Sequence, residues 1–239
     1  LKTKNIIKIL KKIYLVSLMK TSLIQNKIIK ERKKCIKKHY DVEVAFKDGF
    51  CALFTAYGDS DIKYHWLHTD YSMYDCTAKY KNLFTKIFKC FNKIIGISKS
   101  VVERFQAKYP DTNCTVIYNL IDENKIKKQS NLNQINFDNK LNLISVGRIH
   151  NMKGYDRLIK VFNRLNKEKK LDDVYLRIIG DGPDMQLIKT MVKEYSLEDK
   201  IDIMGQKKNP FPYVQASDAF LMCSRYEPFG LVILEAMIL

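Results

Sequence analysis

The stretch LNLISVGRIHNMKG, residues 141–154, decides the fold of the second half of the chain. Its first six residues form a short apolar run that indicates a strand, and Gly147 ends that run. Residues 154–168 then show a helical pattern, and residues 174–179 give a second strand. A strand, a helix and a strand in this order are typical of a parallel sheet with crossover helices.

The same alternation continues toward the C-terminal end. Residues 180–183 (Gly-Asp-Gly-Pro) form a turn that places proline near the first position of a helix. Further strands are expected at 201–204 and 218–222, and a last helix begins near Phe229. We therefore expect residues 141–239 to form a partial doubly wound α/β domain of the nucleotide-binding type, without its last units.

The first half of the chain follows a similar rhythm. Ser100 and Glu103 have the spacing of a capping box, which predicts a helix that runs through Lys108. Residues 123–140 are rich in Asn, Lys, Gln and Ser and indicate a linker, which leaves residues 1–122 as a partial N-terminal domain with a basic N-terminal segment. Four stretches in this half indicate strands, at residues 41–46, 62–67, 94–97 and 114–118.

Composition indicates an ordered, globular protein. Hydrophobic residues make up 46% and charged residues 28% of 239 residues, which does not fit a disordered chain. The six cysteines are scattered without a C-x-x-C pair, so we expect free thiols in a reducing, cytoplasmic environment. No apolar run reaches 18 residues, so no membrane-spanning segment is expected. The chain begins with Leu and stops inside an expected helix, and we take it as part of a longer protein.

The positive charge is concentrated near the N-terminus. The net charge is +16, and residues 1–40 hold 13 Lys and Arg against the single acid Glu31, which gives 13 − 1 = +12. Apolar residues alternate with these lysines, a pattern that suits the anionic inner face of a membrane. An ordinary lysine-rich solvated helix is the alternative. Nucleic acid is not expected as a partner, because Tyr14 alone is a poor stacking platform.

Two loops of the second half carry residues suited to a diphosphate. In the first, Gly147 ends a strand, and Arg148 and Lys153 bracket a turn that Gly154 closes. Arginine offers a planar fork and lysine a compact point charge, and both neutralise phosphate oxygens. A plain loop with two solvated cations is the alternative.

The second loop, residues 224–231, leads into the last helix. Free amides at a helix N-terminus, here those of Gly230 and Leu231, can bind phosphate oxygens. Glu227 and Glu235 are eight residues apart, and with a helix that starts at Phe229 we place Glu235 about 9 Å along its axis. Two carboxylates at that separation could accept hydrogen bonds from the hydroxyls of different parts of one ligand. Either residue alone is as easily a helix cap or a surface glutamate.

Taken together, these elements resemble the retaining family 4 glycosyltransferases of GT-B fold, of the bacterial type that builds capsule, exopolysaccharide or lipopolysaccharide. The resemblance covers residues 140–239 and implies two Rossmann-like domains, both incomplete at the chain ends. It is carried by Gly147-Arg148, Lys153-Gly154, Gly180-Asp181-Gly182-Pro183, Glu227-Pro228-Phe229-Gly230 and Glu235-Ala236-Met237, in the family's order and spacing. It reaches more weakly into the first half through Trp66-Leu67-His68-Thr69-Asp70, Gly96-Ile97-Ser98-Lys99-Ser100 and Ile117-Tyr118-Asn119.

The resemblance implies a donor, an acceptor and the roles of the charged residues. The donor would be a nucleotide-diphosphate sugar, and the acceptor a glycan or a lipid-linked glycan. Arg148 and Lys153 would neutralise the departing diphosphate. Glu227 would hold the hydroxyls of the transferred sugar, and Glu235 those of the ribose.

The resemblance also assigns the remaining contacts. His68 would face the transferred sugar across the interdomain cleft, although a buried histidine of the core is the alternative reading. No metal and no cofactor are expected, because two cations take the place of the metal. Further donor contacts would come from Gly147, Gly205, Phe229, Gly230 and Leu231.

Other functions remain open at this stage. A sugar-nucleotide epimerase of GT-B type would use the same donor site without an acceptor. A domain that binds a nucleotide sugar without turning it over is the non-enzymatic alternative. A basic surface module that relies on residues 1–40 alone is a further one. The sequence does not identify the sugar, the base or the acceptor.

Overall fold

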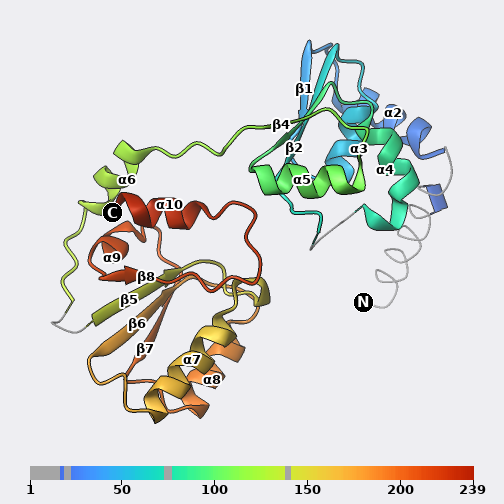
Figure 1. Ribbon diagram of the computed structural model, residues 1–239. Helices are drawn as coiled ribbons and strands as arrows, with labels where there is room; N and C mark the ends of the chain where they lie inside the picture. Colours follow the sequence, from blue (N-terminus) through green and yellow to red (C-terminus); the bar gives the residue numbers. More distant parts are fainter. Residues whose placement is uncertain (1–16, 19–22, 73–76, 138–140) are drawn as a thin grey trace. The chain divides into compact units, whose positions relative to one another are not determined.

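The computed structural model describes residues 17–18, 23–72, 77–137 and 141–239. The chain divides into two units, Leu1–Tyr118 and Asn119–Leu239. Each unit is built on a sheet of four parallel strands with helices packed against it, as Figure 1 shows. The fold is therefore α/β with two parallel sheets, as the sequence indicated.

Unit 1 has the sheet order β1-β2-β3-β4, so each strand lies beside the next one in the chain. Right-handed crossovers that all step in one direction place their helices on one face of such a sheet. The strands are β1 (Val42–Ala45), β2 (Ile62–Leu67), β3 (Lys93–Gly96) and β4 (Cys114–Val116). The helices are α2 (Leu23–Cys35), α3 (Phe50–Ala56), η1 (Ala78–Tyr80), α4 (Lys81–Phe88) and α5 (Lys99–Lys108).

Helix α2 turns its apolar face into unit 1. Ile24, Ile28 and Arg32 recur every four residues, and all three are buried. The Arg32 guanidinium pairs with Glu43 of β1 and donates to the carbonyl of Phe54 in α3 at 2.8 Å. The lysine-rich face of α2 is thus left outside, whereas residues 1–16, which hold half of the apolar residues of the basic segment, lie outside the described residues.

The buried pair also sets which face of β1 is exposed. Because Glu43 points to the buried Arg32, the alternate residues Val42 and Val44 lie on the other face and remain 45% exposed each. The alternation at residues 41–46 therefore marks a strand whose apolar side is exposed in this unit.

Unit 2 has the sheet order β7-β6-β5-β8, all parallel. Two crossovers step from β5 to β7, and the last one steps back across β5 to β8, so helices lie on both faces. Figure 1 shows α7 and α8 together on one face and α9 and α10 on the other. The strands are β5 (Leu141–Val146), β6 (Val174–Ile179), β7 (Ile201–Gly205) and β8 (Ala219–Phe220). The helices are α6 (Glu123–Ser130), η2 (Asn151–Lys153), α7 (Tyr155–Lys167), α8 (Met185–Glu194), α9 (Phe211–Gln215) and α10 (Leu231–Ile238).

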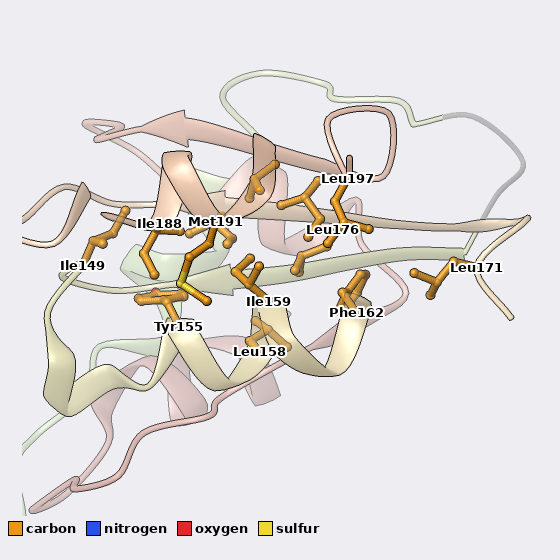
Figure 2. Packing of buried hydrophobic residues seen from close by; sticks show 13 residues of the cluster. Ile149, Tyr155, Leu158, Ile159, Phe162, Leu171, Leu176, Ile188, Met191 and Leu197 are labelled. Atoms are coloured by element: carbon orange, nitrogen blue, oxygen red, sulfur yellow. The ribbon is translucent and has the colours of Figure 1, made fainter. Parts of the chain in front are cut away.

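The core of unit 2 holds the sheet and the first crossover helices together. Figure 2 shows Tyr155, Ile159 and Phe162 of α7 in one cluster with Ile188 and Met191 of α8. Strand residues such as Leu176 complete this cluster. The start of α7 packs into this core and so anchors the residues that follow β5.

Three local expectations differ from the structure. The cap of α5 is Ser98, whose hydroxyl accepts from the amide of Val101 at 3.3 Å, and not Ser100. The stretch expected as a linker, 123–140, begins with helix α6, which packs against α9 and α10 within unit 2. Helix α10 starts at Leu231 and not near Phe229, because Gly230 before it adopts a left-handed conformation.

The described residues contain no helix with the length and apolar character needed to cross a membrane.

Candidate functional site

The crevice beside the carboxyl ends of β5 and β8 is the place where the strand order of unit 2 reverses. Strands β6 and β7 lie on one side of β5, and β8 lies on the other. In open α/β sheets, ligands bind outside the carboxyl ends of the strands at this switch point. The loop after β5 (residues 147–154) and the loop after β8 (residues 221–230) therefore flank the candidate site.

These two loops meet through a lysine and a glutamate. The ammonium group of Lys153 forms an ion pair with the Oε2 atom of Glu227, and the hydroxyl of Ser224 lies 3.5 Å from the same oxygen. The two side chains are 29% and 19% exposed. Both line a small recess with Val232, the second residue of α10. Lys153 therefore lies beside the start of α10.

The backbones of the two loops also touch. The thiol of Cys223 donates to the carbonyl oxygen of Lys153 at 3.1 Å. Gly154 has φ 71, and a Cβ atom built there would lie 2.2 Å from the carbonyl oxygen of Cys223. No side chain fits between the loops at this point, so Gly154 is required by both its conformation and its close contact.

Arg148 lies in a cavity next to this recess. A volume of about 700 Å³ extends over the carboxyl ends of β5, β6 and β7. Its wall includes Gly180 and Gly182, where an added Cβ would lie 1.9 and 2.1 Å from backbone oxygens. Among the described residues, Arg148 forms no ion pair and is exposed to this cavity. Gly147 lines it too, with Gln206 and Lys207, which directly follow Gly205.

Arg148 and Lys153 therefore line neighbouring spaces rather than one. The cavity and the recess share Val146, the last residue of β5. An elongated ligand that crosses Val146 could meet both cations. Lys153 and Glu227 are therefore in direct contact, as the sequence-based hypothesis of a shared ligand needs, whereas Arg148 lies in the cavity on the other side of Val146.

Helix α10 presents its N-terminus beside the same loop. Gly230 caps it with φ 78 and is buried, and Leu231 is its first residue and is 38% exposed. Phe229 is half-buried. Because the helix starts two residues later than expected, Glu235 lies about 6 Å along its axis rather than about 9 Å.

Glu235 is half-buried, and burial raises the pKa of its carboxyl group. Among the described residues it has no hydrogen-bond partner. A desolvated carboxylate without a partner is costly in the free protein and gains from hydroxyl donors of a ligand. This environment suits the role that the resemblance gives to Glu235.

His68 belongs to unit 1, where it follows β2. Its ring lies 4.6 Å from that of Phe46, centroid to centroid. Burial lowers the pKa of His68, and neighbouring Asp48 only partly offsets this, so the ring is neutral at pH 7. Its Nε2 atom is buried and has no hydrogen-bond partner among the described residues. Such a nitrogen differs from the satisfied core histidine that was the alternative reading.

The satisfied core histidine of this region is His65. Its Nδ1 lies 3.2 Å from the carbonyl oxygen of Ala45, and its Nε2 lies 3.1 Å from Oδ1 of Asp48. Burial opposes ionisation of Asp48, but hydrogen bonds from His65 and its neighbours outweigh burial and lower the pKa of this carboxyl group. Because both nitrogens of His65 are in use, His65 and His68 do not form a metal-binding pair.

A different group in unit 1 has the donor atoms for a metal. The ligand atoms of His39, Asp41 and Asp61 lie within 4.8 Å of one another, and all three residues are exposed. They precede β1 and β2, at the edge of the sheet opposite to the one where ligands of such folds bind. We therefore assign them no part in the candidate site.

Three charged residues of the site region were not identified from the sequence. Arg225 and Asp156 form a bidentate ion pair between the loop after β8 and the start of α7. Nothing in their spacing, 69 positions, indicates this contact. Lys207, which lines the cavity, was likewise not identified.

Comparison with known proteins places this geometry in a family. Residues 124–239 match the family described as "Glycosyl transferases group 1". A similar protein of Campylobacter jejuni is the N-acetylgalactosamine-N,N'-diacetylbacillosaminyl-diphospho-undecaprenol 4-alpha-N-acetylgalactosaminyltransferase, 31% identical over 124 residues, 52% of this chain and 32% of that enzyme. The O-antigen biosynthesis glycosyltransferase WclY of Escherichia coli is 28% identical over 158 residues, 64% of this chain and 43% of that enzyme. The chain spans less than half the length of these curated relatives.

The fold is shared with solved structures. HepE (Alr3699) of Anabaena, solved with UDP and glucose, superposes with a TM-score of 0.68 at 18% identity, over 90% of this chain and 60% of that one. At this identity the likeness concerns the fold alone. Residues 124–239 of this chain are a group 1 glycosyltransferase domain of the GT-B fold.

Proposed function

We propose that this chain is the donor-binding part of an enzyme that transfers a sugar, with retention, from a nucleotide diphosphate to a glycan or lipid-linked acceptor in bacterial surface polysaccharide synthesis. The observation that carries this proposal is the Lys153–Glu227 pair at the switch point of the sheet. A cation for the diphosphate and a carboxylate for the sugar meet there. The relatives in surface-glycan synthesis support the acceptor class.

The proposed chemistry needs charge stabilisation rather than a metal. The bond between the anomeric carbon and the diphosphate oxygen breaks, and negative charge develops on the leaving diphosphate. An acceptor hydroxyl oxygen bonds to the same carbon, and its proton passes to the leaving diphosphate. Lys153 and Arg148 would stabilise that charge, and the amides of Gly230 and Leu231 would hold phosphate oxygens. Two charge-assisted contacts of about 1.5–3 kcal/mol each would together lower the barrier by roughly 3–6 kcal/mol.

Donor binding would replace the ion pair of the free protein. The diphosphate competes with Glu227 for Lys153, and the released carboxylate can accept hydrogen bonds from sugar hydroxyls. The cavity of about 700 Å³ at the ends of β5, β6 and β7 has room for the nucleoside. Glu235 would bind the ribose.

The test is a panel of nucleotide sugars, namely UDP-glucose, UDP-galactose, UDP-N-acetylglucosamine and GDP-mannose. Thermal shift of the whole chain and calorimetric titration would identify the donor. Proton NMR of the product then gives the anomeric configuration. No binding of any donor would refute the proposal, and release of an epimerised nucleotide sugar without acceptor would favour the epimerase.

We also propose that the basic N-terminal segment, residues 1–40, binds an anionic membrane surface. Because the apolar face of α2 is buried, contact through α2 would be electrostatic, from exposed lysines such as Lys30 and Lys33. Reversing these two charges should weaken binding to vesicles with anionic lipid. Reversing Lys189 and Lys193 on α8 is the matched control. Equal binding of both double variants would remove this role from α2.

A further inference from the structure

Arg225 joins the loop after β5 to the loop after β8. Its two terminal guanidinium nitrogens each donate to one carboxylate oxygen of Asp156 at 2.6 Å. One of them also donates to the carbonyl oxygen of Asn151 at 2.7 Å. The backbone amide of Arg225 donates to the carbonyl oxygen of Met152 at 2.8 Å. One residue thus fastens its own loop to both the turn before α7 and the first turn of α7.

The geometry of this pair makes it directional. The side chains of Arg225 and Asp156 are 27% and 23% exposed, so the pair is partly shielded from water. The hydrogen bonds from Arg225 lower the pKa of Asp156, which is therefore ionised at neutral pH. A planar fork on a carboxylate fixes orientation as well as distance, which a lysine at the same place cannot do.

We propose that Arg225 and Asp156 are positioning residues for the donor site, a role that rests on the proposed function. Asp156 lies three residues after Lys153, and Arg225 lies two residues before Glu227. Fixing Asp156 and Arg225 relative to each other therefore also fixes the backbone that carries Lys153 and Glu227. The clamp, meaning Arg225 with Asp156, sets the distance between the cation for the diphosphate and the carboxylate for the sugar.

The clamp matters most when the donor is bound. Lys153 then turns to the diphosphate and its ion pair with Glu227 is released. Within the described part of the chain, Arg225–Asp156 is then the one ion pair that still joins the loop after β8 to the segment that follows β5. Misplacement of a binding group by about 1 Å can lower turnover by about 100-fold, so a clamp that prevents it has a measurable effect.

The test uses the full chain and two conservative variants, Arg225→Lys and Asp156→Asn. Arg225→Asp combined with Asp156→Arg restores a pair of opposite charges. Arg164→Lys and Glu168→Gln alter an exposed pair on α7 and serve as controls. Amide hydrogen exchange is measured over residues 148–154 and 223–230 without ligand. Turnover is then measured as release of the nucleoside diphosphate from the donor. The donor is whichever of UDP-glucose, UDP-galactose, UDP-N-acetylglucosamine or GDP-mannose binds the wild type.

In both loops, amide hydrogens of the two clamp variants should exchange faster than those of the wild type, while exchange in the sheet stays unchanged. Their kcat/KM should fall about 10- to 100-fold at an unchanged melting temperature, with partial recovery in the charge-swapped protein. Unchanged exchange would overturn the proposal, and so would faster exchange with unchanged kcat/KM. A wild type that binds no nucleotide sugar would instead refute the proposed function, while the exchange data would still decide whether the clamp holds the loops.

Discussion

Replacing Gly154 by alanine is expected to separate the two loops of the donor site. Gly154 has φ 71, a left-handed conformation that costs alanine about 1–2 kcal/mol. The new Cβ would lie 2.2 Å from the carbonyl oxygen of Cys223, whereas real Cβ contacts are essentially never under 3.0 Å. The loops must therefore move apart by at least 3.0 − 2.2 = 0.8 Å. A shift of that size between Lys153 and Glu227 should lower turnover by up to about 100-fold.

Gly205→Ala is the matched control for stability. Gly205 has φ 70, but a Cβ there meets nothing within 4 Å, so this variant pays only the conformational cost of about 1–2 kcal/mol. Gly154→Ala should lose about 1–3 kcal/mol more, because overpacking is added. Urea unfolding should be followed by far-UV circular dichroism, since the single tryptophan, Trp66, lies in unit 1. Equal losses in both variants would show that the loops are not in tight contact.

Three further substitutions test the roles of Arg148, Glu235 and Arg32. Arg148→Ala should lower turnover more than tenfold, measured as release of the nucleoside diphosphate from the donor. An unchanged rate would remove Arg148 from the mechanism. Because the pKa of Glu235 is raised above 4.5, its contribution to stability is full at low pH and is lost as pH rises through the raised pKa. Glu235→Gln should therefore raise the melting temperature at pH 7.5 and weaken nucleotide binding about ten- to a hundredfold, as titration would show. Arg32→Ala should cost about 3–5 kcal/mol in urea unfolding, because Glu43 is left buried and unpaired, and adding Glu43→Gln should recover part of it.

The strands could be predicted because their signal is local. Apolar runs at 62–67, 141–146 and 174–179 give strands with the same bounds in the structure. Short helices were missed because they offer less than three turns of periodicity. Helix α6 is an example, since Ile126 is its only large buried apolar side chain and its partners α9 and α10 lie far along the chain.

Boundaries depended on backbone conformation that the sequence leaves open. Ser98 and Ser100 are both good capping residues, and only the extended backbone of Ser98 decides between them. The sequence leaves open whether Gly230 lies within the last helix or before it, and the structure places it before α10 as a left-handed cap.

The candidate site was predictable in its motifs but not in its connections. Lys153 and Glu227 were expected to share a ligand, and the structure adds that the two side chains pair directly. Whether His68 serves the same ligand stays a prediction. The Arg225–Asp156 clamp depends on two loops being adjacent in space, and no periodicity within either loop encodes that adjacency.

The wall of the large cavity has a consequence for how specificity changes during evolution. Because the added Cβ atoms of Gly180 and Gly182 would strike backbone oxygens, peptide groups rather than side chains define the shape of that wall. Substitutions there distort the frame instead of tuning it. Selection for a different nucleotide sugar would therefore act on side chains that project from the frame, such as Gln206 and Lys207, while Arg148 serves the diphosphate that all these donors share.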